Sequence, residues 1–206
     1  SVALYNNSQV FGAIRANTFT AAGDAQVHLD TQLFSPPSGV LSDAAEEVAE
    51  VDGTLEGGVT PGQSGEDGNA YDFDGVDGRV EVPHDPAYLL NTGTMAFWFR
   101  PSDISGTQAL VSKDASYYVT GGHFRIYLIG NRVECRLQST SSSKYVSSAS
   151  GSIAPDTWYH VAVGFGPDGL RMYLNGVLVD TDSYTGGLGT SSGGVGNEES
   201  MLFGAD

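Results

Sequence analysis

The sequence predicts an all-β fold in which two antiparallel sheets pack face to face. Its 206 residues include 28 glycines, and its apolar residues come in short runs rather than long ones. Five segments alternate apolar and polar residues with the period of two that a strand requires, namely 95–101, 123–130, 132–138, 159–166 and 170–180. Each segment has one apolar face, and two sheets that bury these faces against each other are the simplest arrangement.

The first 69 residues differ in composition from the rest. Residues 1–35 are a series of very short apolar steps with almost no charge, which predicts either stacked solenoid-like β rungs or a strand laid against the main domain. Pro36 and Pro37 mark a break. We interpret 36–69 as a linker that holds one candidate short helix, "SDAAEEVAEVDG", capped by Ser42 or Asp43. The main domain then covers 70–206, and its first strand begins at Ala70.

The stretch "YDFDGVDGRVEVP", residues 71–83, carries four carboxylates between two apparent strands. Asp72 and Asp74 have the same strand parity and point the same way, but calcium takes six to eight oxygen ligands, more than this stretch offers in one direction. Asp77 and Gly78 are the expected composition of a tight turn. We therefore favour a turn over a cation site or an acid/base pair.

Later turns follow the same chemistry. "GPDG" at 166–169 and "NG" at 175–176 predict hairpins that join 159–165 to 170–174 and then to 177–180. Trp98 and Trp158 are predicted to lie in the core. The Gly- and Ser-rich connection 185–200 is either a binding loop or a flexible one, and its composition favours the flexible alternative.

The charge balance limits the partners of the chain. Nine basic residues against 25 acidic ones give a net charge of −16, which argues against nucleic acid as a partner. The acidity favours a solvated surface in an extracellular or salt-rich medium, with recruitment of divalent cations as the alternative. No apolar run approaches the ~20 residues that cross a bilayer, so this segment is not expected to insert into a membrane. The single cysteine, Cys135, is expected to be a small buried apolar residue rather than a nucleophile.

The order of the motifs resembles that of a known family. The run "GTLEGGVTPGQSGEDGNAYDFDGVDGRVEVPHDPAYLLNTGTMAFWFRP", then "ALVSKD", then "DTWYHVAVGFGPDGLRMYLNGVLVDT", is similar to the laminin G-like, concanavalin A-like jelly rolls of microbial surface proteins, which share their architecture with pentraxins. The resemblance covers about residues 50–206 and implies a cell-surface location. Residues 10–33 resemble the β-solenoid regions of pilus-associated surface proteins.

Members of that family continue beyond the strand that matches "MLFGAD" into a closing strand, whereas this sequence stops at Asp206. The expectation is either a fragment of a longer protein or a sheet edge that is completed by another strand, from the chain's own N-terminal segment or from a neighbouring chain.

The resemblance also implies candidate site residues. By comparison with pentraxins, Asp114 and Asp206 fall where calcium ligands are expected, with Asp103, Glu198 and Glu199 in nearby loops; solvated loop acids are the alternative. A sugar ligand is usually held by aromatic rings with polar neighbours. The candidate ligand-binding residues are Tyr117, Tyr118, Arg125, Tyr127, Arg136 and Tyr184, although a sheet with one hydrated face would show the same pattern.

Catalysis is not expected. Glucanases with this sandwich carry a Glu-x-Asp-x-x-Glu strand that sets two carboxylates across the sugar, and the sequence has no such strand. Glu134 is alone in its strand, and the four histidines are scattered. The sequence therefore predicts a non-catalytic extracellular module that recognises a glycan or a surface protein, assisted by calcium. A structural subunit of a filament or tip complex, completed by strand exchange, is the alternative, and a polysaccharide-degrading enzyme ranks last.

Overall fold

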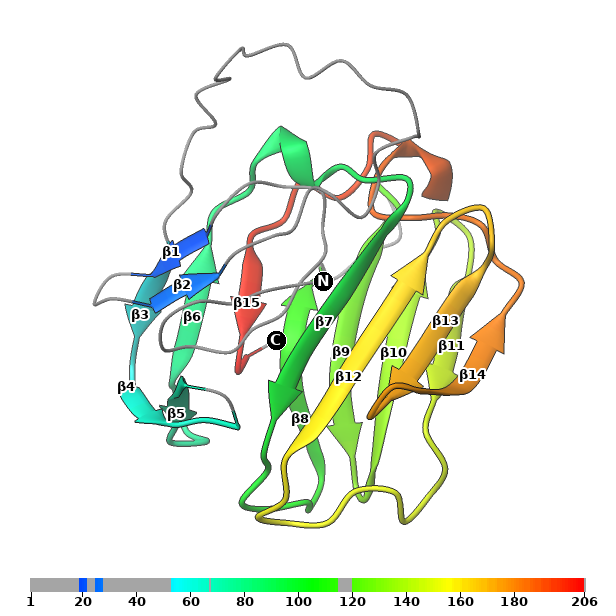
Figure 1. Ribbon diagram of the computed structural model, residues 1–206. Coiled ribbons are helices and arrows are strands. Elements are labelled where there is room, and N and C mark those ends of the chain that lie inside the picture. Colours follow the sequence, from blue (N-terminus) through cyan, green and yellow to red (C-terminus); the bar gives the residue numbers. More distant parts are fainter. Residues whose placement is uncertain (1–18, 22–24, 28–52, 67, 115–119, 206) are drawn as a thin grey trace, which may run out of the picture.

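Two antiparallel sheets of unequal size form the sandwich shown in Figure 1. The computed structural model describes residues 19–21, 25–27, 53–66, 68–114 and 120–205. The seven-stranded sheet has the order β11 (Ser143–Ser147), β10 (Arg132–Gln138), β9 (His123–Ile129), β8 (Thr107–Lys113), β15 (Met201–Phe203), β6 (Arg79–Val82) and β3 (Thr54–Glu56). The four-stranded sheet has the order β14 (Val177–Asp182), β13 (Leu170–Leu174), β12 (Tyr159–Phe165) and β7 (Gly93–Phe99). The predicted all-β sandwich is confirmed.

Smaller elements complete the described part of the chain. β4 (Val59–Ser64) pairs with β5 (Asn69–Phe73), and β1 (Phe19–Ala21) pairs with β2 (Ala25–Val27). Two short 3-10 turns, η2 (Pro86–Tyr88) and η3 (Thr190–Ser192), lie in loops. None of the helices in these described ranges is long and apolar enough to cross a membrane. The predicted helix, apart from its last residue Gly53, and most of the predicted segment 1–35 lie outside the described residues.

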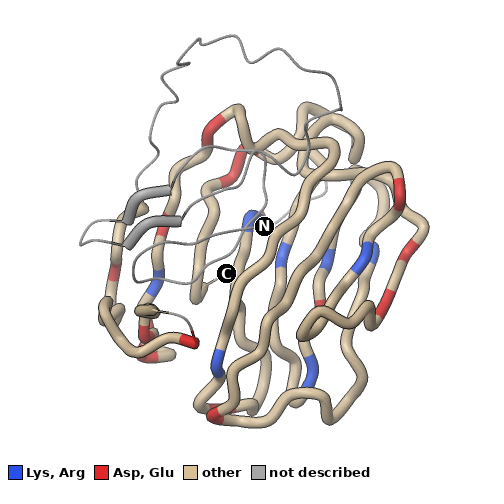
Figure 2. Tube along the Cα trace, viewed as in Figure 1, with Lys and Arg blue, Asp and Glu red and all other residues tan. Residues whose placement is uncertain are grey.

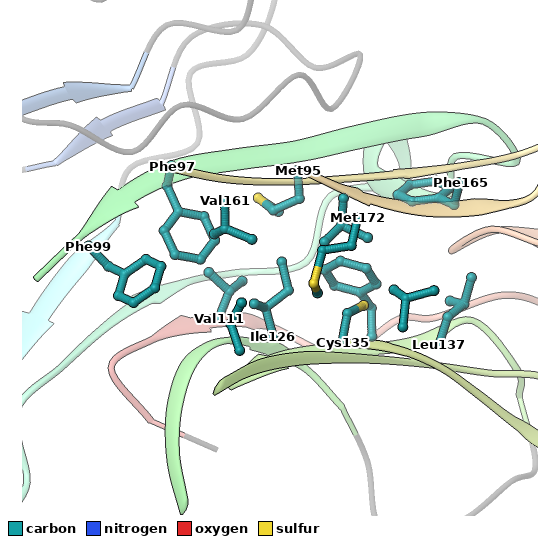
Figure 3. Close-up of a cluster of buried hydrophobic side chains, with 14 of the residues drawn as sticks. Met95, Phe97, Phe99, Val111, Ile126, Cys135, Leu137, Val161, Phe165 and Met172 are labelled. Carbon is teal, nitrogen blue, oxygen red and sulfur yellow. The ribbon is translucent and has the colours of Figure 1, made fainter. Parts of the chain in front are cut away.

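The core fills the space between the two sheets, as Figure 3 shows. Met95, Phe97 and Phe99 project from β7, and the buried faces of β12 and β13 add further apolar side chains from the same sheet. Ile126, Cys135 and Leu137 meet them from the seven-stranded sheet. Burial raises the pKa of the Cys135 thiol, which agrees with its predicted role as a small apolar residue.

The strands begin earlier than the sequence suggests. β3 and β4 both lie within 36–69, the region predicted to be a linker. β3 is the outermost strand of the seven-stranded sheet, where Leu55 pairs with Val80 of β6. β3 has three residues and is flanked by glycines on both sides, so the local composition does not predict a strand. It becomes a strand through its long-range pairing with β6.

The acidic stretch 71–83 forms a turn, but β5 and β6 do not pair with each other. β5 pairs with β4, whereas β6 pairs with β15 and β3. In the loop between them, Oδ1 of Asp74 accepts hydrogen bonds from the backbone N–H groups of Val76, Asp77 and Gly78, at 2.9, 3.2 and 3.1 Å. These donors lower the pKa of Asp74. The carboxylate therefore organises the loop.

The connection 185–200 is packed against the sandwich, which corrects the expectation of a flexible loop. Leu188 and Asn197 are buried, and their backbone N–H groups donate to Leu90 O and Leu188 O respectively. Gly122 lets its own segment approach the loop at Leu188 closely. A Cβ at Gly122 would lie 2.3 Å from Leu188 O, and the φ of +71° at Gly122 favours glycine. Glycine in this region serves close packing rather than mobility.

Candidate ligand-binding face of the seven-stranded sheet

The candidate site lies on the face of the seven-stranded sheet that points away from the four-stranded sheet. Along β9 and β10 the core-facing residues alternate with Arg125, Tyr127, Glu134 and Arg136. The antiparallel register sets Arg125 opposite Arg136 and Tyr127 opposite Glu134. Strand alternation thus brings four polar side chains onto one face without a loop. We call the set Asp114, Arg125, Tyr127, Arg132, Glu134, Arg136 and Tyr145 the basic face.

Tyr127 links two charged groups on the basic face. The guanidinium carbon of Arg125 lies 4.6 Å from the centre of the Tyr127 ring, within the range of a cation–π contact. The Tyr127 hydroxyl donates a hydrogen bond to Oε1 of Glu134. Arg132 Nη2 approaches the other oxygen, Oε2, at 2.9 Å. Burial and the neighbouring carboxylate raise the pKa of Tyr127, so its hydroxyl stays protonated and remains a donor.

Asp114 follows β8 and adds a carboxylate beside Arg136. Nη2 of Arg136 forms an ion pair with Oδ2 of Asp114, and Nδ1 of His123 lies 3.6 Å from the other oxygen, Oδ1. His123 is fully buried, and its Nε2 lies 3.0 Å from the Thr120 hydroxyl. Burial lowers the pKa of His123, and Asp114 partly opposes that change. Asp114 is thereby held at the edge of the arginine pair.

Two like charges face each other at the centre of this arrangement. Directly opposite residues of antiparallel strands have Cβ atoms about 5 Å apart, and like charges in that position are destabilising. Arg125 and Arg136 are in this relation in a chain with only nine basic residues. Figure 2 shows Lys and Arg on the strands of this sheet, whereas many acidic residues lie in loops. The arrangement favours an anionic group near the two guanidinium groups.

Tyr145 extends the face toward its outer edge. It lies opposite Arg136 on β11, and 49% of its surface is exposed. An exposed ring beside Arg136 offers an apolar surface next to hydrogen-bond donors, which suits a sugar ring with a charged substituent.

A fully buried lysine anchors the loop beside Asp114. Nζ of Lys113 donates to the backbone oxygens of Asn197, at 2.9 Å, and Glu199. The Asn197 side-chain amide donates in turn to Lys113 O and Gly122 O. Burial lowers the pKa of Lys113 to about 8. These bonds fix the end of β8 against residues 197–199.

The structure brings together four of the residues predicted from the sequence. Asp114, Arg125, Tyr127 and Arg136 lie on one face. Tyr184 does not: its hydroxyl donates to Ser192 Oγ at 2.9 Å, and Lys144, which lies opposite core-facing Leu137, stacks over its ring. Tyr117, Tyr118 and Asp206 lie outside the described residues.

Sequence reasoning undervalued two members of the basic face, Arg132 and Glu134. The alternation in "RVECR" already places both on the same side as Arg136, and this was the available signal. Treating Glu134 as an isolated acid missed its partners, because Tyr127 comes from the neighbouring strand.

The two tryptophans are not part of the buried core, which corrects a second expectation. Trp98 lies on the outer face of β7, opposite His160, and the two rings are 5.3 Å apart. Trp158 lies just before β12, where the Arg100 guanidinium stacks over its ring at 5.4 Å. Phe97 and Phe99 take the inward positions on β7, so strand parity outweighs the apolar character of Trp98.

A metal centre is not evident in the part of the chain that the structure describes. No group of three or more His, Cys, Asp or Glu side chains is arranged there to hold an ion. The carboxylate of Asp114 is engaged by Arg136, and Asp103 lies at the opposite end of β8, where it accepts a bond from Ser105 N. The described residues therefore do not by themselves fit the predicted calcium site.

Comparison with solved structures finds the same fold in the binding domains of neurotoxins. The binding domain of botulinum neurotoxin DC in complex with SialylT is 19% identical, with a TM-score of 0.52, and the match covers 75% of this chain and 39% of that one. The receptor binding domain of the botulinum neurotoxin C/D mosaic serotype is 14% identical, with a TM-score of 0.57, over 75% and 38% of the chains. The likeness shows the fold alone, and this chain spans well under half the length of those chains.

Sequence comparison agrees with the fold. No curated protein sequence matches the chain. A laminin G-type family profile matches residues 74–201, from the Asp74 loop to the start of β15. The chain therefore belongs to the concanavalin A-like lectin/glucanases superfamily.

Proposed function

We propose that this chain is a non-catalytic recognition module that binds an acidic glycan through the basic face of its seven-stranded sheet. The observation that carries the proposal is the direct opposition of Arg125 and Arg136 across β9 and β10. Asp114 forms an ion pair with Arg136 at the edge of this arrangement. A carboxylate or sulfate on the ligand would accept hydrogen bonds from the two guanidinium groups.

The aromatic residues of the face suit the rest of a sugar. Tyr127 holds the Arg125 guanidinium in place by stacking, which lowers the entropy that Arg125 would lose when a ligand binds. Tyr145 is exposed beside Arg136 and can stack on an apolar sugar face.

Two of the structural neighbours support a binding role. One neurotoxin binding domain is described in complex with SialylT, and another with rat synaptotagmin II. The two carboxylates of the basic face, Asp114 and Glu134, both form ion pairs with arginine. This pairing supports a role in recognition rather than in acid–base catalysis. We place the module outside the cell, as part of a larger surface or pilus-associated protein.

The test measures binding of a sialylated oligosaccharide and of its carboxyl-reduced analogue by calorimetry. Replacing Arg125 and Arg136 together by Gln is expected to weaken binding of the acidic form by more than roughly 100-fold, because each hydrogen bond to a charged group contributes about 1.5–3 kcal/mol and two such donors are removed. Arg171→Gln on the opposite side of the sandwich is the matched control and should leave binding unchanged. Equal affinity for the acidic and reduced oligosaccharides would reject the role of the arginine pair.

Calcium assistance remains a prediction. Asp114 would have to release Arg136 in order to bind the ion, with Asp206 as its expected partner. Added calcium should then raise the melting temperature of the native chain but not that of Asp114→Asn. Release of reducing sugars from the bound glycan would contradict the non-catalytic assignment.

A second candidate function rests on the edge of the four-stranded sheet. Among the described strands β7 pairs with β12 alone, and the four strands of its sheet face a sheet of seven. A strand donated by a neighbouring chain could therefore pair with β7 and make the protein a structural subunit of a filament or tip complex. A Pro substitution at a β7 residue whose backbone N–H points away from β12 removes a donor to the added strand. It would then abolish assembly and spare glycan binding.

A further inference from the structure

We propose that Lys113 and Asn197 form a self-modifying site, at which the lysine amine attacks the asparagine carboxamide and joins the two side chains by an amide bond. Both residues have an exposed fraction of 0%, and neither belongs to the basic face. The cross-link would tie the end of β8 to the segment that precedes β15, across 84 positions of the sequence. It is independent of the proposed glycan binding.

Lys113 occupies a core position. It lies opposite the buried Phe124 of β9 and has the strand parity of Val111, which projects into the core (Figure 3). A lysine is almost never fully buried unless a carboxylate pairs with it, because removing its charge from water is costly. Among the described residues the ion pairs involve only arginine and histidine, so Lys113 has no carboxylate partner there. A reaction that turns the ammonium group into a neutral amide would remove this cost.

Hydrogen bonds hold the amine and the carboxamide in one buried cluster. Nζ of Lys113 donates to the backbone oxygens of Asn197, at 2.9 Å, and Glu199. Nδ2 of Asn197 donates in return to the backbone oxygen of Lys113 and, at 2.8 Å, to that of Gly122. Each side chain is therefore fixed on the main chain of the other. Fixing two reacting groups side by side removes most of the entropy cost of bringing them together.

Two neighbouring groups suit the chemistry of amide formation. The backbone N–H of Glu199 donates to Oδ1 of Asn197 at 3.0 Å. This donor polarises the carbonyl and would stabilise the negative charge that develops on Oδ1 when Cγ is attacked. Nδ1 of His84 lies 3.3 Å from Nζ of Lys113, within reach to accept its proton. Burial lowers the pKa of His84, which favours the neutral ring that a base requires.

The bond changes balance without an outside reagent. Lys113 first passes one proton to His84 and becomes a free amine. Its Nζ then forms a bond to Cγ of Asn197, the bond from Cγ to Nδ2 breaks, and a second proton moves from Nζ to the departing nitrogen. That nitrogen leaves as ammonia and takes up the proton held by His84. An ammonium side chain and a carboxamide thus become a secondary amide and one ammonium ion, with no oxidation or reduction.

The experiment measures the intact mass of the denatured native chain and maps its tryptic peptides. We expect the mass to fall short of that calculated from the sequence by one ammonia. Trypsin does not cleave after a lysine whose amine is an amide, so residues 80–125 and 172–206 should appear as one branched peptide. An amide bond survives denaturation, so both measurements report the cross-link directly.

Variants identify the two reacting groups and the base. Lys113→Met and Asn197→Ala should each restore the full mass, whereas Lys144→Met, at the one other lysine of the chain, should keep the deficit. His84→Phe retains both reacting groups and removes the proton acceptor. In a time course after refolding, it should slow the appearance of the branched peptide roughly 100-fold.

Two results would overturn the proposal. A native chain that keeps its full mass and is cleaved after Lys113, even after long incubation in the folded state, contains no cross-link. Loss of ammonia with normal cleavage after Lys113 would place the reaction elsewhere, such as a cyclisation of Asn175 onto the nitrogen of Gly176. Glycan binding by the basic face is measured separately, so either result leaves the proposed function standing.

Discussion

The two outer faces of the sandwich are built from the same kind of strand and differ in almost everything else. On β9 and β10 the outward positions hold Arg125, Tyr127, Glu134 and Arg136, joined by ion pairs and hydrogen bonds. On β7 and β12 the equivalent positions hold Ala96, Trp98, His160 and Ala162. Inward residues of both pairs are uniformly apolar. Core packing thus fixes the fold, and the outward half of each strand is free to specify a partner.

This difference gives the basic face its own physical signature. Binding of an anion to the basic face is electrostatic and should weaken as salt is added. The strands β7 and β12 hold no Lys, Asp or Glu, so substitutions at their outward positions should leave that salt dependence unchanged. An affinity for the acidic glycan that does not change with salt would contradict the electrostatic assignment.

The largest expected effect comes from the buried anchor of the basic face. Lys113→Met should lower the free energy of unfolding by about 2–3 kcal/mol, because it leaves the buried carbonyl of Asn197 and the part-buried carbonyl of Glu199 without this donor. It should also weaken glycan binding, since Asp114 follows directly in the chain. Urea denaturation measures the stability.

The control for this variant is Lys144→Met, the one other lysine of the chain. Lys144 lies over the Tyr184 ring and should contribute about 0.5 kcal/mol. A Lys113→Met protein as stable as the control would show that the end of β8 is held by packing alone.

A smaller effect comes from removing one hydroxyl on each face. Tyr127→Phe takes away the donor to Glu134 and should cost about 1–2 kcal/mol of stability, together with a loss of affinity for the acidic glycan. Tyr173→Phe keeps the aromatic ring on the outer face of the four-stranded sheet and should leave both stability and glycan binding unchanged. Melting curves and calorimetry on the two variants make the comparison direct. Equal costs for both would mean that Tyr127 contributes packing rather than a polar bond.

How much the sequence could predict depended on the range of the interactions. Period-two alternation placed β7, β9, β10, β12 and β13 correctly, because each strand shows its own buried face. The same alternation grouped Arg125 with Tyr127 and identified Arg136, three residues that the structure brings together.

Most of the misses needed knowledge of distant partners, and Trp98 is the exception. β3 is a strand only because β6 pairs with it, and the loop 185–200 is ordered only because it packs against Leu90, Gly122 and Lys113. Trp98 was assigned to the core on its apolar character, although the parity of β7 already pointed it outward. The role of Glu134 was missed because its hydrogen-bond donor, Tyr127, comes from the neighbouring strand β9.

The smallest effect concerns histidines on the two faces, and it follows from proton linkage. Burial lowers the pKa of both His123 and His160, so the folded protein favours the neutral ring. Their contribution to stability is complete above the ordinary value of 6.5 and is lost as pH falls through the lowered pKa, because the unfolded chain binds protons first. Asp114 partly offsets this loss at His123, whereas burial is the cause at His160.

His160→Phe should therefore flatten the loss of stability between about pH 7 and about pH 5, because it removes a ring that must take up a proton beside Trp98. Asp114→Asn should steepen that loss, because the carboxylate that favours protonated His123 is gone. Urea denaturation at each pH measures both. Relative to the native chain, a flatter pH profile in His160→Phe and a steeper one in Asp114→Asn are the expected results, and an unchanged profile in Asp114→Asn would show that burial rather than the carboxylate governs His123.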